Sequence, residues 1–307
     1  MHQSSQLHRL LRRELLASLL LGACAAPAAA ARLQLPPIIT PPTQQHLVGK
    51  VIFQELVTPD LTRAKQFYGS LLGWTFRDVA ADELAYTEVI LGNREIGGLF
   101  QRNIPANEHR QSAWLAYFAA LDADAAVESA LQHGGKLLFG PLSFPNRGRE
   151  AVLADPQGAV FAVLASSSGD PSDLLAEPGE WVWSSLITRD PDTDAGFYQT
   201  LFDYEVFTAP VSAGPEHLVL ASQGYARASV NPPPAAAAGF HPHWLNYIRV
   251  DDAASVAVRV AALGGRILVA PRPAPSGGTI ALAADPLGAP FGLLQLSIAD
   301  DAATGAQ

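Results

Sequence analysis

The chain carries the stretch TPDLTRAKQFYGSLLGW at residues 58–74 and a matching stretch, TRDPDTDAGFYQTLFDY, at residues 188–204. In both, an Asp that can cap a helix precedes apolar residues at helical spacing, which predicts a short amphipathic helix. A strand-like apolar run, Val51–Val57, leads into the first stretch. Because matching positions lie 130 residues apart, the sequence contains the same structural unit more than once.

Further motifs recur at the same offset and define the domains. The repeated motifs are WLxY at 114–117 and 244–247, GG at 134–135 and 264–265, and DPxG at 155–158 and 285–288. Each half is predicted to contain two units of strand, helix and three strands. The predicted organisation is a domain at 47–166, a polar linker at 167–178, a second domain at 179–297 and a disordered tail at 298–307.

The first 23 residues resemble the signal peptide of a bacterial lipoprotein. Basic residues precede a short apolar run that ends in Leu21-Gly22-Ala23-Cys24, and Cys24 is the only cysteine. This predicts cleavage before Cys24, acylation of its thiol, and a protein anchored by lipid in the bacterial cell envelope, facing the periplasm. Residues 24–46, rich in Ala and Pro, are expected to bury little and to form a tether. The alternatives are an ordinary signal peptide, a twin-arginine signal and an uncleaved membrane helix.

Composition excludes several classes of function. The net charge is −9 with only 20 Lys and Arg among 307 residues, which argues against a nucleic-acid partner. The single cysteine excludes disulfides and cysteine-based catalysis within the domains. The chain has no phosphate-binding loop, dinucleotide fingerprint or G-x-S-x-G motif, so nucleotide binding and serine hydrolysis have no support.

The repeated motifs together resemble the vicinal oxygen chelate superfamily, which contains glyoxalase I, bleomycin resistance proteins and extradiol dioxygenases. The resemblance implies an α+β fold of two tandem domains. In each domain, paired units would curve their mixed sheets around a cavity, with the helices outside. It also implies a divalent metal, held in the cavity by His, Gln and Glu side chains.

The expected ligand positions of this chain hold few such side chains. They fall at Phe53, Ala116, Ala162 and near Glu88 in the first domain, and at Trp183, Asn246, Gly292 and near His217-Leu218 in the second. We therefore predict no metal site and no cofactor. His241 and His243 lie on one face of an extended segment, but no third ligand is evident and a solvated loop is the simpler interpretation.

Aromatic residues of the predicted strands indicate a cavity for a flat or apolar molecule, although the same residues could fill a closed core. Glu55 and Glu88 are candidates for an acid–base pair, unless Arg94 or Arg149 neutralises one of them. Arg147 and Arg149 are expected in a loop at the cavity mouth, or in solvent. The predicted cavity residues are Phe53, Glu55, Glu88, Trp114, Tyr117, Trp183, His217, Trp244 and Tyr247.

The prediction for function is metal-independent binding of a small organic molecule by an envelope-anchored protein, as a monomer or homodimer. One alternative is a metal-dependent enzyme, a glyoxalase-like lyase or a dioxygenase, with Glu55, Glu88 and His217 as ligands. The other is a non-catalytic interaction module. Contact with a membrane is expected through the lipid anchor alone.

Overall fold

The structure is a computed structural model, and it describes residues 34–79, 85–102, 112–209, 217–233, 240–274 and 277–297. Cys24, the predicted signal peptide and the predicted tail lie outside these residues, so the predictions made for them stay predictions. Within the described ranges, no helix is long and apolar enough to cross a lipid bilayer.

The first domain has the predicted order of elements, with two units of one strand, one helix and three strands. The first unit comprises β1 (Val51–Thr58), α4 (Leu61–Leu72), β2 (Thr75–Val79), β3 (Tyr86–Leu91) and β4 (Arg94–Gln101). The second unit comprises β5 (Ala113–Ala119), α5 (Ala123–Gln132), β6 (Lys136–Phe144), β7 (Gly148–Ala154) and β8 (Val160–Ser166).

The second domain repeats this order. Its first unit comprises β9 (Trp181–Ile187), α6 (Pro191–Phe202), β10 (Glu205–Ala209), β11 (His217–Ser222) and β12 (Tyr225–Asn231). Its second unit comprises β13 (His243–Arg249), α7 (Ala253–Ala262), β14 (Arg266–Pro273), β15 (Thr279–Ala284) and β16 (Pro290–Gln295).

Each domain forms one eight-stranded mixed sheet. The strand orders are β2-β3-β4-β1-β5-β8-β7-β6 and β10-β11-β12-β9-β13-β16-β15-β14. Within a unit the first and last strands pair in parallel, and the two units of a domain meet through the antiparallel pairs β1–β5 and β9–β13. The sheets do not close into barrels. The predicted α+β class and the tandem arrangement are confirmed.

Each of the four helices in the described ranges begins after an Asp, as the sequence predicts for Asp60 and Asp190. Asp60, Asp122, Asp190 and Asp252 are the N-cap residues, and each side chain accepts a hydrogen bond from a backbone N–H of the first turn. These bonds satisfy donors that have no partner inside the helix. Helix α4 ends at Gly73, whose φ of 74° lies in the left-handed region that glycine adopts without strain.

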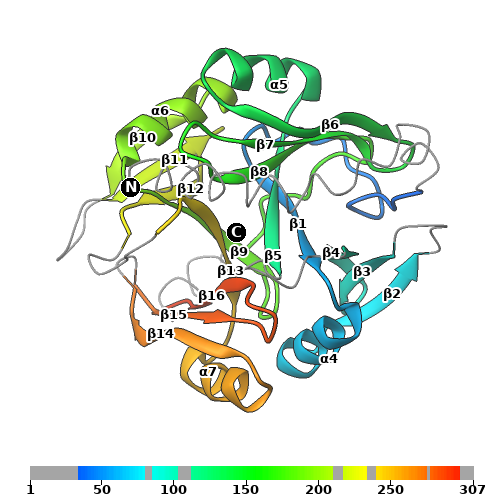
Figure 1. Ribbon diagram of the computed structural model, residues 1–307, viewed down its shortest axis with the longest axis vertical. Coiled ribbons are helices and arrows are strands. Elements are labelled where there is room, and N and C mark those ends of the chain that lie inside the picture. The colour runs from blue at the N-terminus through cyan, green and yellow to red at the C-terminus, as the bar shows by residue number, and fades with distance from the viewer. Residues whose placement is uncertain are drawn as a thin grey trace, which may run out of the picture.

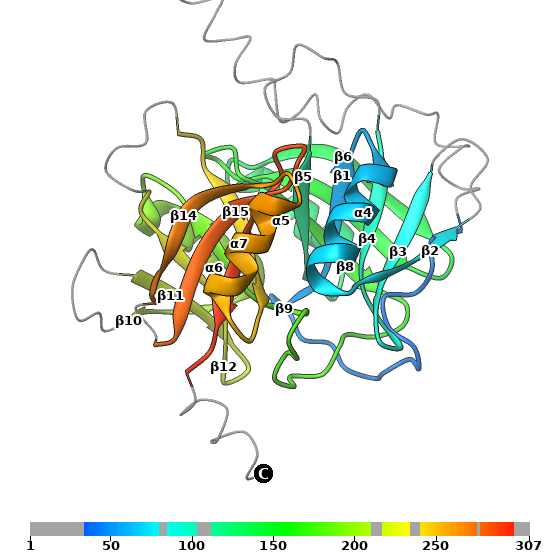
Figure 2. The same cartoon turned by 90° about the horizontal axis from the view of Figure 1, so that it is seen from below.

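The two domains pack against each other through their helices and the faces of the sheets next to them. Figure 1 shows α5 beside α6 at one end of the molecule and α4 beside α7 at the other, and Figure 2 shows the second pair from below. One hydrophobic core joins the second unit of domain 1 to the first unit of domain 2. Another joins the two remaining units. The arrangement has approximate two-fold symmetry.

Residues of the repeated motifs link the domains. Trp114 Nε1 donates to the Tyr68 hydroxyl at 2.8 Å, and that hydroxyl donates to Asp285 of the other domain at 3.4 Å. The symmetric link runs from Trp244 to the Tyr198 hydroxyl at 2.9 Å, and from there to Asp155 at 3.1 Å. The motifs that identify the repeat therefore build the interface between its copies.

The segment before β1 differs from the expected tether. Leu35 and Ile38 are only 4% and 1% exposed, so the expectation that residues up to 46 bury little is wrong for this part of the segment. The two side chains pack against aromatic residues of the first sheet. Apolar burial outweighs the cost of ordering a few residues, two of which are the conformationally restricted Pro36 and Pro37. We call residues 35–39 the strap.

Candidate functional site

Alternate side chains of each strand point to opposite faces of the sheet, and one face is turned away from the helices. On β1, Leu56 joins the core around α4, whereas Phe53 packs with Tyr117 on the other side. We call that other side the far face, because a ligand in the predicted cavity would lie there. In domain 1 it carries Phe53, Glu55, Tyr86, Glu88, Tyr117 and Glu150.

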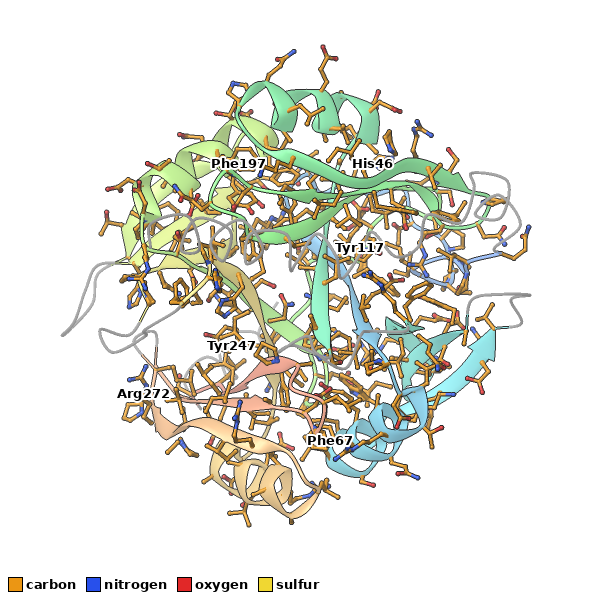
Figure 3. All side chains as sticks on the ribbon, viewed as in Figure 1. His46, Phe67, Tyr117, Phe197, Tyr247 and Arg272 are labelled. Carbon is orange, nitrogen blue, oxygen red and sulfur yellow. The ribbon has the colours of Figure 1, made fainter. Side chains whose placement is uncertain are left out.

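The strand registers identify the matching residues of domain 2. Phe53 lies opposite Tyr117 just as Trp183 lies opposite Tyr247, and Glu55 pairs with Gly98 just as Ser185 pairs with Ser229. His217, which pairs with the last residue of β10, takes the place of Tyr86. Figure 3 labels Tyr117 on β5 and Tyr247 on β13, near the middle of the molecule. The far face of domain 2 thus carries Trp183, Ser185, His217, Ser229, Asn231 and Tyr247.

Trp114 and Trp244 lie on the opposite face from this group. Both point toward the helices, where they bind Tyr68 and Tyr198 as described above. They lie three positions before Tyr117 and Tyr247, an odd spacing that places the two side chains on opposite faces of a strand. The structure therefore does not bring these two tryptophans together with the other predicted cavity residues.

A network of buried polar side chains is centred on Glu55. Its Oε1 accepts from the Tyr86 hydroxyl at 2.8 Å and from Arg147 Nη1 at 3.2 Å, and its Oε2 accepts from the Tyr117 hydroxyl at 2.5 Å. Burial raises the pKa of both tyrosines well above the usual value, so they remain protonated donors. Gly98 makes room for this network, since a Cβ there would lie 2.2 Å from the Tyr86 hydroxyl.

Arg147 is the residue that balances the charge of Glu55. It is completely buried, its guanidinium lies 4.4 Å from the centre of the Phe53 ring, and its Nε donates to the Pro36 carbonyl at 2.8 Å. The expectation of an Arg147 in solvent or at the cavity mouth is wrong, because the strap covers this end of the far face. Arg149 instead binds Asp124 on the outside.

Glu150 is a buried carboxylate that the sequence analysis missed. It is 5% exposed, and its Oε2 has no hydrogen-bond partner among the described residues. Burial, with a smaller contribution from the negative charge of Glu55, raises the pKa of Glu150 to about 8. Its side chain is therefore predominantly protonated at neutral pH. The alternation of side chains along β7 was the only sequence signal for Glu150. It does not say which face of the strand is buried.

Glu55 and Glu88 share the far face but not a common site. Strand β4 lies between them, with Gly98 paired to both residues. Glu88 forms an ion pair with Arg77 of the neighbouring strand β2, while Glu55 is bound to Arg147. The structure therefore does not assemble the expected acid–base pair, and the neutralising residues are neither Arg94 nor Arg149.

The hydrogen-bonded side chains on the far face of domain 2 include no Asp, Glu, Lys or Arg, and Arg272 lies close enough to Tyr247 to influence its pKa. Ser229 accepts from Trp183 Nε1 at 3.1 Å, lies 2.8 Å from the Ser185 hydroxyl, and accepts from Asn231 at 3.2 Å. Asn231 in turn lies 2.6 Å from Nδ1 of His217. Tyr247 is hydrogen-bonded to Ser185, and burial raises its pKa. Six side chains of this face thus form one connected network of donors and acceptors.

The two far faces differ in access. Phe53 and Tyr86 are 5% and 2% exposed beneath the strap, whereas their counterparts Trp183 and His217 are half-buried. Val219 and Leu282 of the same domain 2 sheet are also half-buried.

The side chains at the expected metal positions do not form a ligand set. Phe53, Trp183 and Ala162 offer no donor atom, and Ala116 and Asn246 lie on the helix side, where Asn246 accepts from Ser184. The ligand positions expected at Ala116 and Asn246 are therefore wrong by one residue. The residues on either side of them, a Leu and a Tyr in each domain, are the ones on the far face. At Gly292, a Cβ would lie 2.1 Å from the Tyr247 ring, so even a Glu there would displace that ring.

The two histidines before β13 are the remaining candidates for metal ligands, and they do not form a metal site. His243 Nδ1 lies 2.9 Å from the His241 carbonyl oxygen, and Phe240 packs beside the His243 ring. Across the described part of the chain, no group of three or more His, Cys, Asp or Glu side chains converges on a point where a metal ion could bind.

Comparison with known proteins agrees with this architecture. The model of the Glyoxalase/Bleomycin resistance protein/Dioxygenase superfamily matches residues 43–163. The chain is 29% identical over 257 residues to "Putative glyoxylase CFP32" of Mycobacterium tuberculosis, covering 83% of this chain and 98% of the relative. It is also 29% identical over 283 residues to the anthracycline biosynthesis protein DauV of Streptomyces, covering 83% and 96%.

Solved structures share the fold at low sequence identity. The Mn(II)-bound glyoxalase from Novosphingobium aromaticivorans is 19% identical with a TM-score of 0.55, covering 81% of this chain and 82% of that one. A variant of homoprotocatechuate 2,3-dioxygenase from B. fuscum is 14% identical with a TM-score of 0.56, covering 83% and 73%. The first domain therefore matches the glyoxalase, bleomycin resistance protein and dioxygenase superfamily, the vicinal oxygen chelate proteins, and the second domain repeats the fold of the first.

Proposed function

We propose that the protein binds a small, flat, uncharged organic molecule on the far face of domain 2, without a metal ion. The observation that carries this proposal is the difference between the two domains. Trp183 and His217 are half-buried at positions whose counterparts in domain 1 are covered by the strap. A half-buried aromatic ring beside a fixed hydrogen-bonding network is the usual composition of a small-molecule site.

The chemistry of the network favours a neutral ligand. Ser185, Ser229, Asn231 and Tyr247 offer hydroxyl and amide groups, which pair with phenols, ketones and amides without the cost of burying an ion. Trp183 supplies a ring face for stacking, and its N–H is already bound to Ser229, which fixes the ring orientation. A flat molecule with one or two polar groups fits both features.

Two further considerations support the ligand class and the metal independence. The relatives DauV and DnrV are named as anthracycline biosynthesis proteins, which is consistent with a role in handling a small organic molecule. Divalent metals in proteins need several convergent oxygen or nitrogen ligands, and of the positions expected for them here only Glu88, Asn246 and His217 carry such an atom, one in domain 1 and two in domain 2. The alternative of a metal-dependent lyase or dioxygenase finds no such donor set among the described residues.

The test is calorimetric titration with a panel of neutral bicyclic and tricyclic aromatic compounds, beginning with 2-naphthol, in the presence of EDTA. We expect saturable binding at one site, weakened at least tenfold by Trp183→Ala, which corresponds to about 1.4 kcal/mol. Tyr225→Ala is the matched control, because Tyr225 is 53% exposed in the same domain and lies at the far end of β12.

Two results would overturn the proposal. One is the failure of every compound in a broad panel to bind. The other is binding that EDTA abolishes and that stoichiometric Mn(II), Zn(II), Ni(II) or Fe(II) restores, which would favour the metal-dependent enzyme instead.

We also propose that the protein is exported and anchored through Cys24. The support is the sequence Leu21-Gly22-Ala23-Cys24 after a short apolar run with basic residues before it. In a bacterial host, the wild-type protein is expected in the membrane fraction and the Cys24→Ser variant in the soluble fraction. An unchanged membrane fraction for Cys24→Ser would show that acylation does not hold the protein there.

A further inference from the structure

The strap occupies the far face of domain 1 in the way a ligand would. Ile38 packs in the cluster that contains Phe53 and Tyr117, and Leu35 packs with Tyr86. Between them the Pro36 carbonyl accepts a hydrogen bond from Arg147 Nε at 2.8 Å. The occupant thus presents two branched aliphatic side chains and one amide carbonyl to a buried, charged donor.

The chain that follows the strap is held by contacts of its own. Downstream residues are fastened separately to the linker between the domains: Thr43 N donates to the Ser168 carbonyl at 2.8 Å, and Leu47 N donates to Asp170 at 2.6 Å. These contacts anchor the chain on the N-terminal side of β1. If residues 35–39 detached, these contacts would still hold the chain before β1 in its place.

Beneath the strap the far face has the properties of a binding site. Arg147 is completely buried, and its Nε is the group that would lose its partner if the strap detached. Glu150 is 5% exposed and has an oxygen with no partner among the described residues. Unpaired buried polar groups are costly, so a ligand that supplied the missing hydrogen bonds would gain free energy.

The charges of this face restrict the ligand. Glu55 forms an ion pair with Arg147 and Glu150 is predominantly protonated at neutral pH, so the single positive charge of this face is already balanced. An anionic ligand would add a further negative charge in a buried setting and is disfavoured. A neutral carbonyl oxygen accepts from Arg147 without adding charge, as the Pro36 carbonyl does now.

From these contacts we propose that the far face of domain 1 is a second small-molecule site, selective for a neutral molecule that carries a carbonyl oxygen next to a branched aliphatic group. The strap is its built-in competitor. A ligand must displace residues 35–39, so its apparent affinity is reduced by the fraction of molecules in which the strap is detached. This site is distinct from the one in domain 2, whose hydrogen-bond network contains no Asp, Glu, Lys or Arg.

The experiment compares full-length variants in their affinity for 3-methylbutanamide, a neutral amide with a branched alkyl group, by saturation-transfer NMR. Leu35→Ser combined with Ile38→Ser removes both apolar contacts of the strap. We expect this variant to bind the amide at least tenfold more tightly than the wild-type protein. The matched control, Gln34→Ser with Gln44→Ser, changes two exposed residues of the same segment and should leave the affinity unchanged.

Two related probes test the chemistry of the site. 3-Methylbutan-1-ol lacks the carbonyl and 3-methylbutanoate is charged, so both should bind the strap variant at least tenfold more weakly than the amide. Equal affinity of all three probes, or equal affinity of wild type and strap variant for the amide, would overturn the proposal.

A measurement on the wild-type protein decides the question even if the strap variant does not fold. Ligand entry requires detachment of the strap, so 3-methylbutanamide should accelerate hydrogen exchange at the amides of Ile38 and Ile39, and 3-methylbutan-1-ol should not. Exchange that stays constant as the amide concentration is raised to its solubility limit would show that the site does not take this ligand.

Discussion

Replacing Arg147 by Met is expected to lower the free energy of unfolding by about 3–5 kcal/mol, because it leaves the Glu55 carboxylate buried without its partner. Arg147 is completely buried and gives hydrogen bonds to Glu55, Tyr86 and the Pro36 carbonyl. Met fills a similar volume, so the loss reflects charge and hydrogen bonding rather than a large cavity. Urea denaturation followed by circular dichroism at neutral pH measures the change.

Arg149→Met provides the matched control. Arg149 lies two positions further along the chain and carries the same charge, but it is partly exposed and binds Asp124 at the surface. Surface ion pairs contribute little to stability, so the urea midpoint should be nearly unchanged. If the two variants lose the same stability, the buried network around Glu55 does not stabilise the fold more than a surface ion pair does.

Replacing Glu150 by Gln is expected to remove much of the pH dependence of stability between about pH 5 and pH 8. Burial raises the pKa of Glu150 from 4.5 to about 8, so the folded state binds a proton that the unfolded state has released in this range. The wild-type protein should therefore lose stability as the pH rises, by up to about 1.4 kcal/mol per pH unit from this residue. Below pH 4.5 the effect is absent.

The free energy of unfolding, plotted against pH, should differ increasingly between Glu150→Gln and the wild type. From pH 5 to pH 8 the wild type should lose more stability than the variant. Asp155, whose pKa burial raises to about 7, contributes to both profiles and cancels in their difference. Glu128→Gln removes the same charge from an exposed position on α5 and should run parallel to the wild type. Parallel profiles for Glu150→Gln would contradict the raised pKa.

The fold could be predicted from the sequence because its signals are local and occur twice. Asp60 and Asp190 cap their helices where the motifs place them, and the DPxG motif turns before the last strand of each domain. The contacts that these motifs make with each other could not be predicted in the same way. The contacts of Tyr68 with Asp285 and of Tyr198 with Asp155 span the two domains, and no spacing rule predicts them.

The site was only partly predictable, for two physical reasons. Strand alternation gives a period but not the face that is buried, so Trp114 was grouped with Tyr117 although the two point in opposite directions. The strap makes a non-local contact through a segment without periodicity, and its Pro-rich composition indicated an extended tether. Arg147 could not be placed in the interior until the cover over it was known.

The approximate two-fold relation of the two halves has a consequence for how they can diverge. A dimer of identical single domains would place the same residue at both copies of every position, so a change that suits one half is imposed on the other. Joining the halves in one polypeptide removes that restriction. Equivalent positions, such as Trp183 and Phe53 or Ser185 and Glu55, can then mutate independently on the same fold. One half can therefore acquire a function that the other half does not have.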